Sequence, residues 1–172
     1  MGVIFLRYVK GILFILVAVV MISGCTSNTA TNKTFDYGNF SFQYPSNWTV
    51  NNISLGSQNS GETTPIVGLN PQSGGGNATI TIYTFNPGTI FSAKEFVNTP
   101  MSPPMTNNTT ITIANTTGYT FETFDKNNNL KTKTVVFDKN GKTYMIDVSS
   151  DPSNYDYGVT IWNMIIQTFN VK

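Results

Sequence analysis

Acidic side chains are the main candidates for acid–base chemistry in this chain of 172 residues, because it contains no histidine. Without histidine, a serine–histidine–aspartate or cysteine–histidine site cannot form, and a zinc site is not expected. Two carboxylates could still act together, as they do in glycoside hydrolases. The acids considered for such a pair are Glu62, Glu95, Glu122, Asp125, Asp138, Asp147, Asp151 and Asp156.

Most of these acids stand at predicted helix starts and turns, where local structure alone explains them. Asp147 is the exception, because it lies inside a predicted strand beside Met145 and Ile146. We expect its side chain to face outward. A carboxylate-dependent surface hydrolase, for example a glycosidase, is therefore kept only as an alternative function, and we predict no catalytic residue.

Cys25 is the only cysteine and the candidate site of lipid attachment. It follows a short basic start and an apolar run over residues 11–22, which is short for a membrane span and typical of a signal-peptide core. The sequence Ile22-Ser-Gly-Cys25 resembles the lipobox of prokaryotic lipoproteins, so we predict a signal peptide over residues 1–24. In the alternative, residues 3–22 form an uncleaved anchor. Both interpretations tether the domain at the extracytoplasmic face of the cell membrane.

Asparagine residues in Asn-x-Ser/Thr sequences could carry N-linked glycans in a host with the necessary enzymes. The composition alone would give about five such sequences, so the eight present are a weak excess. They are Asn32, Asn39, Asn47, Asn52, Asn77, Asn107, Asn108 and Asn115.

Charged residues are few, at 11% of the chain, and their types argue against nucleic acid as a partner. The sole arginine, Arg7, lies in the N-terminal export segment, and from Cys25 onward eight lysines face nine acids. A protein that binds a duplex needs clustered cations to displace counterions. We therefore expect no nucleic-acid binding.

Two loops superficially match cofactor motifs, and neither is complete. The three glycines within residues 71–77 lack the Gly-Lys-Ser/Thr ending of a phosphate loop. Residues 125–129 place oxygen side chains as in a calcium loop, but Leu130 and Val136 stand where glycine and glutamate are required. We therefore predict no cofactor and no metal, and we assign residues 125–129 to a hairpin turn.

Apolar residues that recur at every second position predict a domain rich in strands. The first strand contains Phe40, Phe42 and Tyr44 and stops at Pro45, which cannot donate a hydrogen bond to a sheet. Asn140-Gly141 is a strong signal for a tight hairpin turn. The further strands are predicted at residues 49–55, 78–85, 109–114, 118–124, 130–138 and 143–149.

Two helices are predicted. Ser92 and Glu95 have the spacing of a capping box and should start a short helix over residues 93–98. A longer helix should start at Asp151 and carry an apolar stripe from Tyr155 through Trp162 to Phe169. The loop that follows the short helix contains two methionines, at positions 101 and 105, which either pack locally or mark a contact surface.

The sequence FSFQYPSNW (40–48), together with YMIDVSS (144–150) and the ending IIQTFNV, resembles PsbP-like domains of the Mog1/PsbP fold class. This resemblance implies an α+β domain, an antiparallel β-sheet flanked by helices in an α/β/α sandwich, with the C-terminal helix packed on the sheet. We assign residues 25–38 to a flexible polar tether and residues 39–172 to the domain. Trp48 and Trp162 should lie in its core.

The same resemblance implies a function in binding or assembly. Plant members of the family assist assembly of photosystem II, and Mog1 binds a small GTPase, but neither partner transfers to this chain. We predict a lipid-anchored, non-catalytic module that recognises a protein or envelope component. A purely structural envelope protein is, like the hydrolase, an alternative.

Overall fold

A computed structural model describes residues 31–51, 64–72, 76–85 and 92–172. All of them lie in one compact unit of the chain, Thr31–Lys172. Cys25, the predicted signal peptide, Glu62 and Asn52 lie outside the described residues. Within those residues, no helix has the length and apolar character needed to span a membrane.

The first strand, β1 (Asn32–Tyr37), lies where the sequence predicted a flexible tether. It pairs antiparallel with β2 (Phe40–Pro45), so the tether prediction is wrong for this segment and the folded unit begins at Thr31 rather than Asn39. Only Phe35 of β1 is half buried, and its ring stacks 5.1 Å from that of Phe42. Strand pairing, the aromatic contacts of Phe35 and Tyr37 with β2 and the ion pair of Asp36 with Lys172 hold β1 to the domain.

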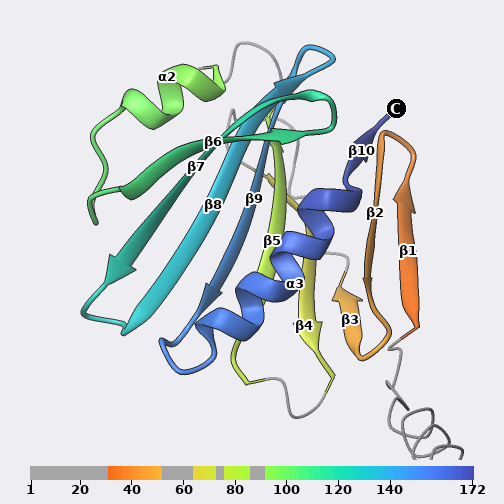
Figure 1. The fold of residues 1–172 in the computed structure, drawn as a ribbon, viewed down its shortest axis with the longest axis horizontal. Helices are drawn as coiled ribbons and strands as arrows, with labels where there is room; N and C mark the ends of the chain where they lie inside the picture. Colours follow the sequence, from red (N-terminus) through yellow and green to blue (C-terminus); the bar gives the residue numbers. More distant parts are fainter. Residues whose placement is uncertain (1–30, 52–63, 73–75, 86–91) are drawn as a thin grey trace, which may run out of the picture. The chain divides into compact units, whose positions relative to one another are not determined.

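The strands form two antiparallel sheets (Figure 1). A three-stranded sheet has the order β1-β2-β10, with β10 at Asn170–Val171. A seven-stranded sheet has the order β3-β4-β5-β9-β8-β7-β6. Its strands are β3 (Trp48–Asn51), β4 (Thr64–Pro71), β5 (Thr79–Phe85), β6 (Thr106–Ile113), β7 (Thr116–Asp125), β8 (Leu130–Lys139) and β9 (Lys142–Ser150).

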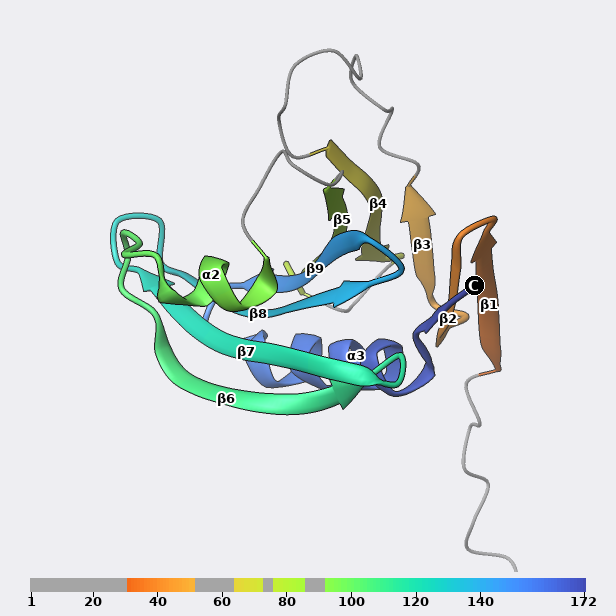
Figure 2. The ribbon, with the colours of Figure 1, turned by 90° about the horizontal axis from the view of Figure 1, so that it is seen from above.

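The two described helices, α3 (Tyr155–Thr168) and α2 (Ala93–Asn98), lie on opposite faces of the seven-stranded sheet, as Figure 2 shows. Gly158 of α3 faces β9, where a Cβ atom on this residue would lie 2.9 Å from the Val148 side chain. The missing side chain therefore lets α3 approach the sheet closely. The predicted α+β class, with the C-terminal helix packed on an antiparallel sheet, is confirmed.

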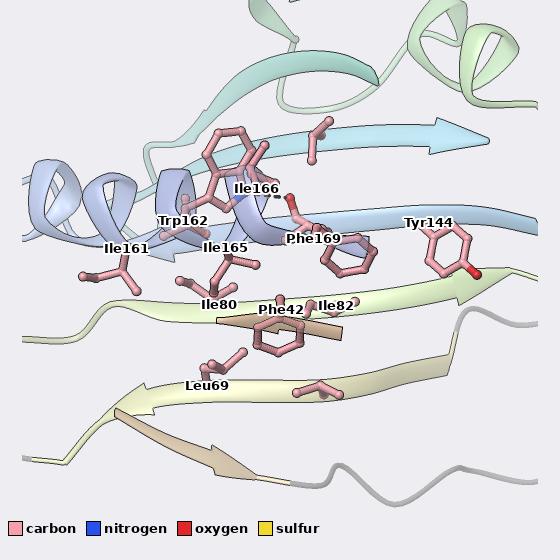
Figure 3. Packing of buried hydrophobic residues seen from close by; sticks show 14 of the residues in the cluster. Phe42, Leu69, Ile80, Ile82, Tyr144, Ile161, Trp162, Ile165, Ile166 and Phe169 are labelled. Atoms are coloured by element: carbon pink, nitrogen blue, oxygen red, sulfur yellow. Dashed lines mark hydrogen bonds between the residues drawn. The ribbon is translucent and has the colours of Figure 1, made fainter. Parts of the chain in front are cut away.

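The core lies between α3 and the sheet, and Figure 3 shows its packing. Trp48 is fully buried and Trp162 is 2% exposed, so both tryptophans lie in the core as predicted. The indole N–H of Trp162 donates to the carbonyl oxygen of Ile146 at 3.0 Å, and that of Trp48 donates to the Tyr157 hydroxyl at 3.1 Å. Burial of these large rings is therefore accompanied by satisfied polar groups.

The short sequence motifs correctly predicted the tight turns and the start of the short helix. Asn140 and Gly141 both have positive φ, 51° and 73°, as a type I′ turn requires, and join β8 to β9. Ser92 and Glu95 form the predicted capping box of α2. Residues 125–129 form the predicted turn between β7 and β8.

The long helix begins and ends inside its predicted limits. The Asp151 carboxylate accepts backbone N–H groups of Ser153 and Asn154 and thereby closes a turn. The helix therefore starts at Tyr155, after Asn154, rather than at Asp151. Phe169 is extended rather than helical, but it is still buried in the core.

Candidate functional site

Five of the acids considered for a carboxylate pair have local structural environments. Glu95 caps α2, and the carboxylate of Asp138 accepts the first backbone N–H of that helix at 3.0 Å. Asp125 and Asp151 accept hydrogen bonds within turns, which lower the pKa of each carboxyl group. Asp156 is exposed in the first turn of α3, where a negative charge is favourable.

Glu122 and Asp147 are the two acids that neither a cap nor a turn explains, and they lie on opposite faces of the sheet. Across the strands, Asp147 pairs with Thr134, whereas Glu122 pairs with Lys133. Adjacent residues of a strand point to opposite faces, so Glu122 lies on the α3 side and Asp147 on the other. These two carboxylates therefore cannot act together on one substrate.

Asp147 corrects an expectation, because its carboxylate is not turned to solvent. Its Oδ1 atom is buried and makes no hydrogen bond to the described residues. This burial raises the pKa of Asp147 to about 7, against a smaller lowering by a hydrogen bond from the Thr134 hydroxyl. Burial, and then the nearby Asp147 charge, also raise the pKa of Tyr83.

On the α3 face, Glu122 is the centre of a small polar cluster. Its carboxylate lies 3.5 Å from the ammonium group of Lys133 and accepts a hydrogen bond of 2.9 Å from the Asn107 amide. Although partial burial opposes ionisation, the Asn107 and Tyr155 side chains and the charges of Lys133 and Lys131 lower the pKa of Glu122.

Both lysines of this cluster also lie over aromatic rings of α3. The ammonium group of Lys131 is 3.9 Å from the centroid of the Tyr155 ring, and that of Lys133 is 5.5 Å from the Trp162 ring. The Tyr155 hydroxyl is buried near Glu122 without a hydrogen bond of good geometry. Burial, followed by Glu122, raises the pKa of Tyr155, so it stays neutral, and the cluster holds one carboxylate beside two ammonium groups.

Beside this cluster lies a cavity of about 280 Å³ between the helix and the last strand of the sheet, which we call the α3–β6 hollow. Its lining combines apolar side chains with hydroxyl and amide groups. The lining residues are Thr109, Ile111, Thr112, Thr120, Lys133, Trp162, Asn163, Ile166 and Gln167. A cavity of this size and mixed polarity is suited to one large side chain or a small ligand.

The sequence analysis missed this hollow. Asn163 and Gln167 are four residues apart on α3, which marks them as neighbours on one helix face. Their position next to β6 follows only from the strand order β9-β8-β7-β6, which brings the hairpin of β6 and β7 to the side of the helix. No local pattern in the sequence specifies that order.

A second, shallower groove of about 330 Å³ adjoins the end of α2. Both methionines noted in the sequence, Met101 and Met105, line it. Met101 is 43% exposed, whereas Met105 also packs partly against the small cluster of Ala93, Phe121 and Val136. The two alternatives for this loop are therefore divided between its methionines. Met105 packs locally, and Met101 is available at the surface.

The other predicted site residues are placed as follows. Every candidate glycosylation asparagine within the described residues is exposed, namely Asn32, Asn39, Asn47, Asn77, Asn107, Asn108 and Asn115. Among those same residues, no group of three or more Asp, Glu, Cys or His lies close enough to hold a metal ion.

Comparison with known proteins gives a family and a fold. The family model for PsbP-like proteins matches residues 20–171. The solution structure of cyanobacterial PsbP (CyanoP) from Synechocystis sp. PCC 6803 is similar, with a TM-score of 0.59 and 13% identity, over 87% of this chain and 98% of that one. LpqN, involved in cell envelope biogenesis of Mycobacterium tuberculosis, has a TM-score of 0.50 and 15% identity, over 86% of this chain and 87% of its own. No curated protein matches the sequence.

Proposed function

The chain belongs to the PsbP-like protein family, and from this premise we propose that residues 31–172 are a non-catalytic binding module. Its partner is a protein or another component of the cell envelope. The observation that carries the proposal is the α3–β6 hollow, a cavity of about 280 Å³ on the face of the sheet that carries α3. A cavity that combines apolar walls with a few polar groups is the usual form of a binding site.

The electrostatics of the hollow favour binding over acid–base catalysis. Its one charged lining residue, Lys133, is paired with Glu122, whose pKa is lowered rather than raised. A general acid at neutral pH would need a raised pKa. The acid with a raised pKa, Asp147, lies on the opposite face of the sheet.

The module would act at the extracytoplasmic face of the membrane, anchored by lipid on Cys25. The lipobox-like sequence that ends at Cys25 supports this location. The fold shared with LpqN, a protein involved in cell envelope biogenesis, is compatible with it. The exposure of the candidate glycosylation asparagines also suits a surface position.

Photo-cross-linking in intact cells tests the binding function. A photoreactive amino acid replaces Gln167, which is exposed and lines the hollow, and in a matched control it replaces Lys126, which is exposed in the β7–β8 turn. We expect a discrete ultraviolet-dependent adduct from position 167 and none from position 126. Absence of an adduct at 167, or the same adducts from both positions, would show that the hollow binds no partner.

A further inference from the structure

Strand β6 is an open edge of the seven-stranded sheet. It is the last strand in the order and, among the residues that the structure describes, it pairs only with β7. Figure 2 shows it at the outer limit of the sheet. In such a strand, every second residue directs its backbone N–H and C=O groups away from the sheet, where they can pair with another extended chain.

This edge lacks the charges that usually protect an exposed strand. The sequence contains no Asp, Glu, Lys or Arg from residue 96 to residue 121, a stretch that includes all of β6. In contrast, β1 at the edge of the other sheet carries Lys33 and Asp36, and Asp36 forms an ion pair of 2.6 Å with Lys172. Because charged side chains on an edge discourage pairing, β6 is much the more open of these two edges.

The regular part of β6 is short and well defined. A register shift interrupts its pairing with β7 between Thr106 and Thr109, and Asn107 has a φ of 56°. At the other end, Ala114 and Asn115 have positive φ and turn the chain into β7. Residues Thr109–Ile113 are therefore the straight segment, with a length of about 17 Å.

The α3–β6 hollow lies just inside this straight segment. Thr109, Ile111 and Thr112 form its β6 side, and Asn163 and Gln167 of α3 form part of the opposite side. Side chains of a strand alternate between the two faces of a sheet, so every second residue of a strand added to β6 would face α3. One of these side chains could enter the hollow.

The chemistry of the hollow indicates which side chain fits. Ile111, Ile166 and Trp162 supply apolar walls, and the amides supply hydrogen-bonding groups. Lys133 is already paired with Glu122 at 3.5 Å, so the hollow has no uncompensated charge that would attract an acidic group. A large, uncharged side chain with a polar end, such as tyrosine, meets these conditions.

We propose that β6 binds an extended, uncharged segment of another protein, which adds an eighth strand to the sheet and places one large side chain in the α3–β6 hollow. This inference rests on the proposed binding function and names the kind of partner and the mode of recognition. Main-chain hydrogen bonds would supply affinity and the hollow would supply selectivity. The alternative occupant, a second copy of the chain, would pair edge to edge in a dimer that light scattering detects.

Selection from a random dodecapeptide phage library on the full-length chain, purified in mild detergent, tests the proposal. Enriched peptides are synthesised, their Kd is measured by fluorescence anisotropy, and amide hydrogen exchange locates the site. We expect uncharged peptides rich in β-branched and aromatic residues, with exchange slowed in β6.

Thr110→Lys and Thr112→Lys provide the decisive variants, because both threonines are exposed on β6 and a lysine there would place charge on the edge. Each should raise Kd by about tenfold or more. Thr49→Lys is the matched control, since Thr49 is exposed on β3 at the other end of the sheet order, and it should leave Kd unchanged. Circular dichroism and melting temperature establish that each variant is folded.

The proposal is overturned if no peptide is enriched, if exchange in β6 does not change, or if Thr49→Lys weakens binding as much as the β6 variants do. It is also overturned if light scattering shows a dimer whose β6 amides are already protected, because a second copy would then occupy the edge. If the adduct from position 167 persists in Thr112→Lys cells, the binding function stands and strand addition is wrong. If peptides bind β6 and slow its exchange but cells yield no adduct, β6 does accept an added strand, and the proposed binding of a cellular partner at the hollow is wrong.

Discussion

Asp147→Asn should stabilise the protein at neutral and alkaline pH. Asp147 lies in β9 between Thr81 of β5 and Thr134 of β8, and its Oδ1 atom is buried without a hydrogen bond to the described residues. An ionised carboxylate in this position loses hydration that the neighbouring hydroxyl groups replace only in part. Asparagine has nearly the same shape and no charge, so the substitution removes this unfavourable contribution.

The size and pH range of the effect follow from the shift in pKa. Burial raises the pKa of Asp147 from 3.8 to about 7 in the folded protein. Between these two values the folded state holds a proton that the unfolded state has released, so the free energy of unfolding decreases as pH rises from about 4 to about 7. A shift of about three units corresponds to an upper limit of about 4 kcal/mol, which is large compared with a typical total stability.

Urea denaturation of a chain that begins at Thr31, followed by the fluorescence of the buried tryptophans, measures this effect at pH 4, 6 and 8. Relative to wild type, Asp147→Asn should gain stability progressively from pH 4 to pH 8. Asp125→Asn is the control, because hydrogen bonds in its turn lower the pKa of the carboxyl group, which is therefore ionised in the folded and the unfolded state above about pH 4. The stability of this variant relative to wild type should be nearly constant from pH 4 to pH 8. If the stability of Asp147→Asn relative to wild type does not change with pH, or if this variant is the less stable protein at pH 8, the reasoning is refuted.

Three further outcomes are expected. Trp162→Ala should lower the free energy of unfolding by about 3–5 kcal/mol, because it removes a buried ring and its hydrogen bond to the carbonyl oxygen of Ile146. Tyr37→Ala, which removes an exposed ring, should lower it much less. Equal melting temperatures for the two variants would contradict the packing. Cys25→Ala should abolish lipid attachment and leave an unprocessed precursor, and mass spectrometry that found an intact segment 1–24 in the native protein would exclude cleavage. EDTA should leave the melting temperature unchanged, because the Asp125 carboxylate in the calcium-like turn already accepts hydrogen bonds from the backbone N–H groups of Asn127 and Asn128. A large decrease in the melting temperature would reveal an ion site.

Features that depend on a few neighbouring residues could be predicted from the sequence. The Asn140-Gly141 turn and the Ser92–Glu95 cap arise from backbone conformation and hydrogen bonds within four residues. The alternation of Phe40 and Phe42 with polar residues marked β2, because one of its faces is buried. The burial of Trp48 and Trp162 follows from the hydrophobic effect once these elements are in place.

Features that depend on distant pairing could not be predicted in this way. Strand β1 has only two apolar residues, Phe35 and Tyr37, and five of its six residues are exposed, so its alternation is too short to distinguish it from a tether. Its order comes from β2, which lies beyond a turn and holds it by a register of six residue pairs. In the same way, burial of Asp147 depends on the residues that cover its face of the seven-stranded sheet. The sequence pattern Met145-Ile-Asp147 does not identify those residues.

The scarcity of charge also limits how this domain can recognise a partner. Cross-strand hydrogen bonds between neutral groups, such as Thr109 with Thr120 at 2.7 Å and Thr132 with Ser149 at 2.8 Å, take the place of ion pairs on the sheet. Lys133, the one charged residue that lines the α3–β6 hollow, is already paired with Glu122, so little unbalanced charge remains in the hollow itself to steer a partner over long distances. Recognition at this site therefore has to arise at short range, from the shape of the hollow and from the backbone groups along β6.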